Sequence, residues 1–137
     1  MDEYEAMTEY TPIKVYARIK ENAILTIVDT GACMSVITKP LAQALGLKWV
    51  PLSRKDVVSI DGKPQPALGE VENLQVVIAN AVTYIKSHVI NSATKSVLLK
   101  TDWIIKYQAD ILGNSRKLRF KIQGRTIKVD VVASRDQ

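Results

Sequence analysis

The stretch Ile24-Leu25-Thr26-Ile27-Val28-Asp29-Thr30-Gly31-Ala32 decides the fold, because it runs from an apolar strand directly into a carboxylate on a tight turn. Apolar and β-branched residues at positions 24 to 28 are typical of a buried β-strand, which would hold Asp29 in a partly buried position. The Thr30 hydroxyl can brace the loop, and Gly31 permits a tight turn and the close approach of a substrate. The small side chain of Ala32 leaves space beside that turn.

Asp29 is therefore a candidate for one half of a pair of catalytic carboxylates. Hydrolysis of a peptide bond by water needs a base to take the water's proton and an acid to protonate the departing amine. Two carboxylates a few ångströms apart supply both, because their mutual repulsion keeps one protonated while the other is ionised. The sequence has no second Asp in a comparable setting, so a copy of Asp29 across a two-fold axis would have to complete the site.

The composition is that of one globular domain. With 137 residues and 47% hydrophobic content, the chain is long enough for one core and too short for two ordinary domains. Residues 1–10 are acidic and unpatterned, so we expect a flexible lead-in or linker there and a folded domain over residues 11–134. No apolar run suits a membrane span and no signal peptide is visible, so we expect no membrane partner and a cytoplasmic location. Cys33 and His88 are the single cysteine and histidine, which predicts no disulfide, metal site or cofactor.

The net charge of +5 is unevenly distributed along the chain. Four acidic residues lie before the first basic residue, Lys14, which leaves 19 basic against 10 acidic groups, or +9, on residues 14–137. Such a surplus can attract nucleic acid or acidic peptides. However, Lys and Arg are scattered and aromatic residues are few, so we interpret the charge as a solvated surface and do not expect nucleic acid as a specific ligand.

Alternating apolar residues predict a mainly β domain with about seven to nine strands and two short helices. A hairpin is expected over residues 13–28 with its turn at 20–22, followed by a strand at 35–37. Thr38 can cap a short helix that contains Pro40 in its first turn and ends at Gly46.

A long hairpin over residues 56–79 is the next expected element. Its turn is Asp61-Gly62, because Asp-Gly readily adopts the positive φ angles that such a turn requires. Pro64 and Pro66 cannot donate backbone hydrogen bonds, which places the start of the returning strand at an edge. The remaining expected elements are a strand pair at 82–90 and 97–99, a helix capped by Thr101 or Asp102 and reaching Tyr107, and a hairpin over 118–132 with its turn at 123–125.

Several of these stretches, taken in order, resemble the retropepsins. The strand and Asp29-Thr30-Gly31-Ala32 are followed by Ser35-Val36-Ile37, by a hairpin with Asp61-Gly62 at its tip, and by Val97-Leu98-Leu99-Lys100-Thr101-Asp102-Trp103. The stretch from Asp102 to Asp110 is most similar to the proteases of gypsy-type LTR retrotransposons. The resemblance spans residues 10 to 132, which is nearly the whole chain.

The resemblance implies an all-β fold, in which each chain forms a closed β-barrel equivalent to half of an acid protease and two chains assemble as a two-fold homodimer. It implies an aspartic endopeptidase that cleaves extended polypeptides of the polyprotein type. No metal or cofactor takes part in that chemistry. The location would then be the cytoplasm or the particles of a retroelement.

The resemblance also assigns roles to particular residues. Asp29 would be the catalytic carboxylate, Thr30 would bond across the dimer axis, and Gly31 would offer its carbonyl to the substrate backbone. A flap at the hairpin tip would close over an extended peptide. The residues expected to contact substrate are Ala32, Cys33, Leu98 and the flap residues Ser59, Ile60, Asp61, Gly62 and Lys63.

The sequence departs from the family pattern in two places. Lys100 stands where the family almost always has Gly, so a long charged side chain would crowd a point at which two backbone segments approach closely. A catalytically weak or inactive domain that dimerises and binds peptides is therefore the alternative function. Cys33 and Thr101 replace an Asp and an Arg that pair with each other in retroviral members, and because both are replaced, no unpaired charge is left.

Other catalytic arrangements are less well supported. Ser35 or Ser59 with His88 could suggest a serine triad, but no Gly-x-Ser-x-Gly turn exists. Cys33 with His88 could suggest a thiol protease, yet nothing marks Cys33 as activated. Alternation instead predicts that His88 is an exposed strand residue, and Trp49 and Trp103 are each expected to be core or helix-packing residues.

Overall fold

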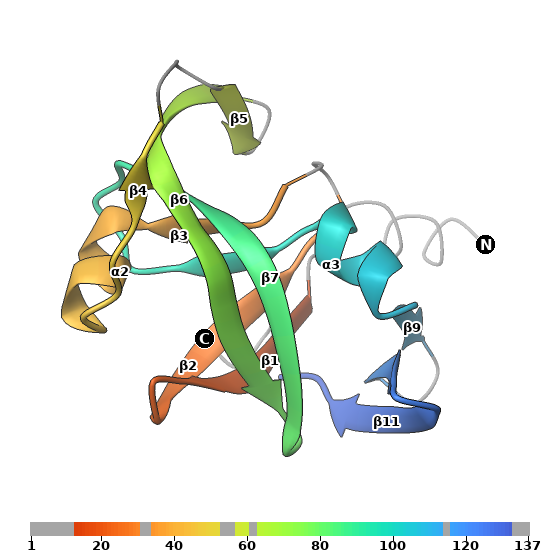
Figure 1. The fold of residues 1–137 in the computed structure, drawn as a ribbon. Helices are drawn as coiled ribbons and strands as arrows, with labels where there is room; N and C mark the ends of the chain where they lie inside the picture. Colours follow the sequence, from red (N-terminus) through yellow and green to blue (C-terminus); the bar gives the residue numbers. More distant parts are fainter. Residues whose placement is uncertain (1–12, 31–33, 53–56, 61–62, 114–115, 133–137) are drawn as a thin grey trace.

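The fold was analysed in a computed structural model, which describes residues 13–30, 34–52, 57–60, 63–113 and 116–132 (Figure 1). These residues form β-strands and two short helices, α2 (Lys39–Ala44) and α3 (Thr101–Lys106), which confirms the prediction of a mainly β domain. No helix within these ranges is long and apolar enough to cross a membrane. The strands are β1 (Ile13–Ile19), β2 (Asn22–Val28), β3 (Val36–Thr38), β4 (Val50–Pro51), β5 (Val57–Ile60), β6 (Lys63–Ile78), β7 (Ala81–Ile90), β8 (Val97–Leu99), β9 (Asp110–Leu112), β10 (Lys117–Ile122) and β11 (Arg125–Asp130).

The main sheet closes into a barrel. Its strand order is β1-β2-β8-β3-β7-β6-β4, and a further pairing of β1 with β6, at Arg18 and Val77, joins the two sides. Strand β5 pairs with β6 outside this ring. Closure leaves no open edge around the barrel itself, and it confirms the closed barrel expected from the sequence.

Strand β8 lies between β2 and β3, although it is only three residues long. It runs parallel to β2, with Ile27 opposite Leu98, and antiparallel to β3, with Val36 opposite Leu98. The prediction that residues 82–90 and 97–99 form a pair was therefore wrong, because β7 pairs with β6 and β3 instead. The consequence is that β8 separates the two strands that flank the Asp29 loop.

The hairpin turns follow the expected turn chemistry. Lys20 and Glu21 have φ angles of 52° and 66°, and Gln123 and Gly124 have 50° and 77°. Two consecutive residues with positive φ are typical of the type I′ turns that join twisted antiparallel strands. The predicted turns at 20–22 and 123–125 are thereby confirmed. A similar turn at residues 79–80 joins β6 to β7 and was not predicted.

Both predicted helices exist, but their proposed side-chain caps do not. Thr38 is the N-cap of α2, yet its hydroxyl makes no capping bond and instead accepts a hydrogen bond from the Ser96 N–H at 2.9 Å. Helix α3 begins after Lys100, which is its N-cap, and not after Thr101 or Asp102. The Thr38 hydroxyl binds a distant loop, and the Asp102 carboxylate accepts bonds from distant Ser35 as well as from the Trp103 N–H in the first turn of α3.

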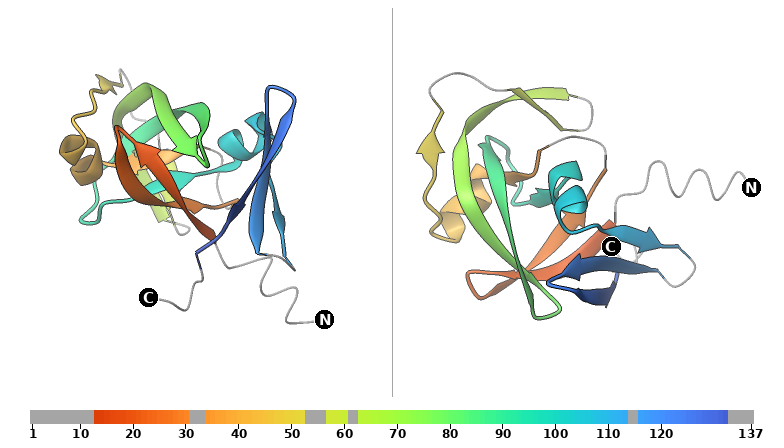
Figure 2. Two further views of the ribbon diagram at one scale, coloured as in Figure 1. Left: turned by 90° about the horizontal axis from the view of Figure 1, so that it is seen from below. Right: turned by 45° about the vertical axis from the view of Figure 1, so that its right-hand side comes forward.

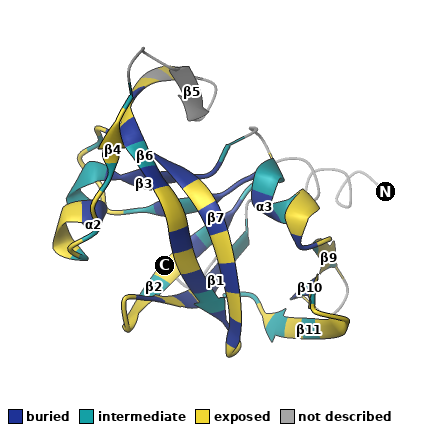
Figure 3. Ribbon diagram, in the orientation of Figure 1, coloured by how far each residue is buried: buried dark blue, intermediate teal, exposed yellow. Residues whose placement is uncertain are grey.

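An aromatic cluster anchors the second sheet to the barrel. Trp103 of α3 is fully buried, and its ring centroid lies 5.4 Å from both the Tyr107 and the Phe120 rings. The Trp103 indole N–H also donates to the Thr83 hydroxyl of β7 at 3.1 Å. Figure 2 shows the sheet β11-β10-β9 beside the barrel, and Figure 3 shows alternating buried and exposed residues along β6 and β7. Trp103 thus confirms its predicted core position.

Trp49, the second tryptophan, is partly buried and packs against the edge of the core. It lies over Gly69 of β6, where an added Cβ would come within 2.4 Å of the Trp49 ring and 2.5 Å of the Val50 carbonyl oxygen. Because one of these contacts is with backbone, side-chain movement alone cannot relieve it. Gly69 is therefore required by close packing.

We predict that Gly69→Ala lowers the free energy of unfolding by about 2 kcal/mol, because the extra methyl group overpacks this contact. Gly113→Ala is the matched control, since nothing lies within 4 Å of a Cβ at Gly113. Urea unfolding of both variants measures the difference. Equal stability of the two variants would contradict this account of Gly69.

Candidate active site

Asp29 lies at the end of β2, in the position that the sequence predicted. Its backbone N–H donates to the Leu99 carbonyl of β8 at 2.9 Å, and its side chain is 27% exposed. Leu99 is fully buried, so the backbone of Asp29 is fixed to a buried strand while its side chain remains partly exposed. This combination lets Asp29 meet both water and a ligand.

Lys100 directly follows β8 and forms an ion pair with Asp29. Its Nζ lies 3.0 Å from Asp29 Oδ2 and its side chain is only 2% exposed. Two unit charges at this distance attract by about 5 kcal/mol at an effective dielectric constant of about 20. The sequence indicated that Lys100 would crowd the backbone, but the lysine side chain instead places a buried cation against the predicted catalytic carboxylate.

A second carboxylate, Asp102, fixes the far end of the Asp29 loop. The Ser35 hydroxyl and backbone N–H donate to Asp102 at 2.6 and 3.0 Å, and the Ser35 hydroxyl accepts the Lys100 N–H at 3.0 Å. Thr101 Oγ1 also donates to the Thr30 carbonyl at 3.3 Å. Sequence reasoning missed this supporting role of Ser35 and Asp102, although the Asp102-Trp103 pair had been noted as part of a family motif.

The serine-triad alternative is not supported by this geometry, because the Ser35 hydroxyl is engaged by Asp102 and the Lys100 backbone. The prediction that His88 is exposed was wrong, since His88 is only 4% exposed. Its Nε2 lies 3.7 Å from Glu70 Oε2. The last four residues of β7 are all buried because β3 pairs there, so alternation no longer indicates exposure.

The other predicted site residues are only partly covered by the structure. Thr30 is exposed, and Leu98 is half-buried in β8. The β5 and β6 hairpin expected as a flap is present, with Ile60 opposite Lys63 and Ser59 opposite Pro64. The predicted residues that lie outside the described ranges are Gly31, Ala32, Cys33, Asp61 and Gly62.

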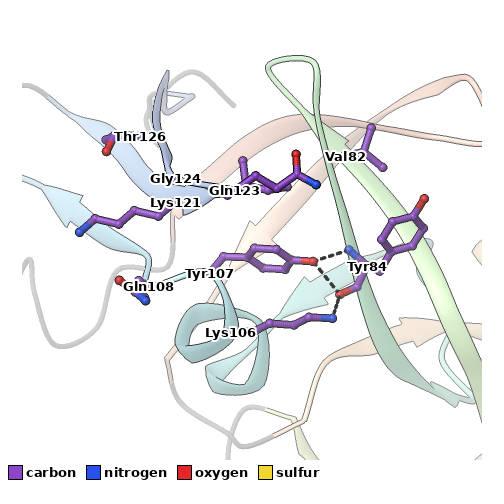
Figure 4. Close-up of a pocket in the computed structure, with 10 residues that line it drawn as sticks. Val82, Tyr84, Lys106, Tyr107, Gln108, Lys121, Gln123, Gly124 and Thr126 are labelled. Carbon is purple, nitrogen blue, oxygen red and sulfur yellow. Dashed lines mark hydrogen bonds between the residues drawn. The ribbon is translucent and has the colours of Figure 1, made fainter.

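A pocket of about 720 Å³ lies elsewhere, between β7, the end of α3 and the β10 to β11 hairpin. None of the predicted site residues lines it. Figure 4 shows that the Tyr107 hydroxyl and the Lys106 amino group point to the Tyr84 backbone. The hydroxyl accepts the Tyr84 N–H at 2.8 Å, and Lys106 donates to the Tyr84 carbonyl at 2.8 Å. These bonds satisfy the edge of β7, which gives them a structural role.

Within the described ranges, no group of three His, Cys, Asp or Glu side chains is arranged to hold a metal ion. Among the described residues, the surroundings of Asp29 include the Lys100 ammonium group and the backbone hydrogen bond to Leu99. The barrel is closed, Asp29 follows β2, and β8 lies between the two strands on either side of the Asp29 loop. These features define the class of retropepsin-like aspartic protease domains.

The comparison with protein families gives the narrower assignment. The family model "gag-polyprotein putative aspartyl protease" matches residues 15–106. This is more than half of the chain, so the chain belongs to that family of gag-polyprotein aspartyl proteases. No relative was found among the curated proteins. The likeness to gypsy-type retrotransposon proteases in particular stays a prediction.

Solved structures share the fold. The retroviral protease-like domain of Ddi1 from Leishmania major has a TM-score of 0.71 at 20% identity, over 93% of this chain and 98% of that chain. A retropepsin-like aspartic protease from Rickettsia conorii has a TM-score of 0.51 at 23% identity, over 77% and 79%. The EIAV protease complexed with the inhibitor HBY-793 has a TM-score of 0.56 at 15% identity, over 76% and 95%. These likenesses confirm the retropepsin-like fold.

We predict that Asp29→Asn alone lowers the free energy of unfolding by about 3 kcal/mol, because it leaves the buried Lys100 ammonium without its charged partner. Adding Lys100→Met should recover at least about 2 kcal/mol of this loss, which a double-mutant cycle measures as a coupling energy. Urea unfolding of all four proteins at one protein concentration gives the cycle.

The matched control is the ion pair of Lys117 and Asp130, whose side chains are 39% and 81% exposed. The coupling from Lys117→Met and Asp130→Asn should stay below about 1 kcal/mol, as is usual for surface pairs. If the coupling energy between Asp29 and Lys100 is no larger than that between Lys117 and Asp130, a buried ion pair at Asp29 is contradicted.

Proposed function

We propose that this protein is one subunit of a homodimeric aspartic endopeptidase that cleaves extended polypeptides. The observation that carries the proposal is the setting of Asp29, whose backbone is fixed by Leu99 while its side chain stays 27% exposed. In a two-fold dimer a second Asp29 would face the first. One carboxylate would take a proton from water while the other protonates the departing amine.

The proposed substrate is an extended peptide, as in a polyprotein. Membership of a gag-polyprotein protease family supports this substrate class. The β5 and β6 hairpin, which pairs with the barrel only through β6, is suited to close over a peptide as a flap. An extended peptide beneath it would gain strand-like hydrogen bonds, with Gly31 and the flap as the backbone partners. The acidic residues 1–10 would be a linker that is trimmed when the domain is released.

Strand β9 is the best surface for the proposed dimer. Among the described residues it is the end strand of the sheet β11-β10-β9. Ile111 at its centre is 44% exposed. The opposite edge, β11, carries exposed Arg125, Lys128 and Asp130, which disfavour edge pairing. Helix α3 connects Lys100 to β9 along one side of the barrel, so the dimer contact and the site are coupled through one short helix (Figure 1).

We predict that Ile111→Asp shifts the protein from dimer to monomer and abolishes cleavage, because it replaces an exposed apolar side chain in the proposed contact with a charge. Val82→Asp is the control, since Val82 is a comparably exposed strand residue at 38%. Sedimentation velocity measures the association state. If Ile111→Asp stays dimeric, or if both variants lose the dimer to the same extent, β9 is not the dimer contact.

A second candidate function is a dimer that binds extended peptides without cleaving them. The ion pair of Lys100 with Asp29 favours it, because a buried cation beside the carboxylate opposes the protonated state that one member of a catalytic pair requires. The fold likeness does not separate the two functions. Cleavage itself is the discriminating property.

We expect concentrated, demonstrably dimeric protein to cleave members of a broad peptide library slowly, and a statine-type transition-state mimic to block this cleavage. Mass spectrometry of the products measures it. The inactive control is Asp29→Asn combined with Lys100→Met, which removes the carboxylate without leaving a buried lysine unpaired. Tight binding of the mimic without any cleavage by the dimer would favour the binding function over the endopeptidase.

A further inference from the structure

Lys100 is placed so that it changes the charge around the Asp29 carboxylate, and its burial distinguishes this effect from blocking the access of a ligand. The Lys100 backbone is held by β8 and by the Ser35 hydroxyl, which accepts its N–H at 3.0 Å. The Lys100 side chain is 2% exposed, whereas the Asp29 side chain is 27% exposed. The ammonium group is therefore enclosed by the protein, whereas the Asp29 side chain that it contacts is partly exposed.

The charge of the site changes when two such subunits associate. A pair of facing carboxylates normally holds one shared proton, because two adjacent negative charges repel each other. Here each carboxylate brings its own ammonium group, so two Asp29 and two Lys100 side chains sum to zero net charge without any shared proton. The repulsion that would favour protonation of one carboxylate is thereby offset.

Loss of the shared proton affects one step of the reaction in particular. When the peptide C–N bond breaks, its electron pair goes to nitrogen, which must receive a proton to leave as an amine. A carboxylic acid supplies this proton in a catalytic pair, and two ionised carboxylates cannot. The Lys100 ammonium is not well placed to replace it, because its side chain is only 2% exposed and its Nζ is bound to Asp29 Oδ2 at 3.0 Å.

We propose that Lys100 sets the charge of the catalytic pair and thereby suppresses cleavage, while binding of extended peptides is retained. The inference rests on the proposed endopeptidase function of Asp29. It assigns the suppression to the charge of Lys100 and not to its size. Gly, which is usual at this position in the family, would leave the carboxylate pair free to share a proton.

The first test compares cleavage rates and inhibitor binding in dimeric wild type, Lys100→Met and Lys100→Gly. Met matches the length of lysine without its charge, so both variants should raise kcat at least about 100-fold, the range expected when general acid catalysis is gained. Binding of a statine-type mimic by the free enzyme and KM should change only a few-fold. Lys95→Met is the control for net charge, because Lys95 is exposed in the loop before β8, and it should behave as wild type.

Two kinetic outcomes overturn the proposal. If Lys100→Gly raises kcat but Lys100→Met does not, size and not charge is the cause. If wild type and Lys100→Met cleave at the same rate, Lys100 suppresses nothing, although the endopeptidase function itself stands. Cleavage by Lys100→Met must also disappear when Asp29→Asn is added, which confirms that the gained activity uses this site.

A second measurement separates failure of this proposal from failure of the endopeptidase function. Carbon-13 NMR of labelled Asp side chains distinguishes a protonated from an ionised carboxyl group. It is applied to the wild-type and Lys100→Met dimers at one mildly acidic pH. The proposal predicts ionised Asp29 in wild type and one shared proton per dimer in Lys100→Met. If this difference in protonation is found but no variant cleaves peptides, the role of Lys100 is supported and the proposed endopeptidase function is refuted. Identical Asp29 signals in both proteins would refute the role of Lys100.

Discussion

The insertion of β8 between β2 and β3 is the constraint on which the rest of the structure depends. This three-residue strand links β2 to β3 within the barrel, and its Leu99 carbonyl accepts the Asp29 backbone N–H at 2.9 Å. The residue after it, Lys100, is consequently held beneath the same carboxylate, and Asp102 two residues further on binds Ser35 at the other end of the loop. One strand therefore determines both the position of Asp29 and its electrostatic surroundings.

The same arrangement explains how a domain can keep the architecture of a protease and still alter its chemistry. Hydrogen bonds and apolar packing define the barrel and the loop that follows Asp29. Lys100 lies near this loop without removing any of these interactions. The cost of burying the ammonium group is offset by its partner at 3.0 Å, so the fold tolerates it. Catalysis is more sensitive, because it depends on the proton that two carboxylates share. Fold and family membership are thus compatible with strongly reduced cleavage.

The sequence predicted those features that depend on neighbouring residues. Alternation and turn residues located the hairpins, and the apolar run before Asp29 located the strand that carries it. The features that it did not reveal depend on contacts between distant segments. Nothing local in Val97 to Leu99 indicates pairing with both β2 and β3, and Lys100 lies 71 residues from the carboxylate that it contacts. His88 was misjudged because alternation loses its meaning where a strand is covered on both faces. Thr38 does not cap α2 with its side chain because its hydroxyl binds the remote Ser96 N–H, and the N-cap position of α3 is Lys100, although Asp102 does accept the Trp103 N–H.

In the proposed dimer, Asp29 belongs to a two-fold site in which each carboxylate has a buried lysine partner. A crystal structure of the dimer with a statine-type mimic tests it most directly. The account predicts that the two Asp29 carboxylates flank the mimic's hydroxyl group, with each Lys100 Nζ about 3 Å from its own Asp29 on the side away from the ligand. Asp29 residues that lie far apart, or Lys100 side chains that turn away into solvent, would contradict it.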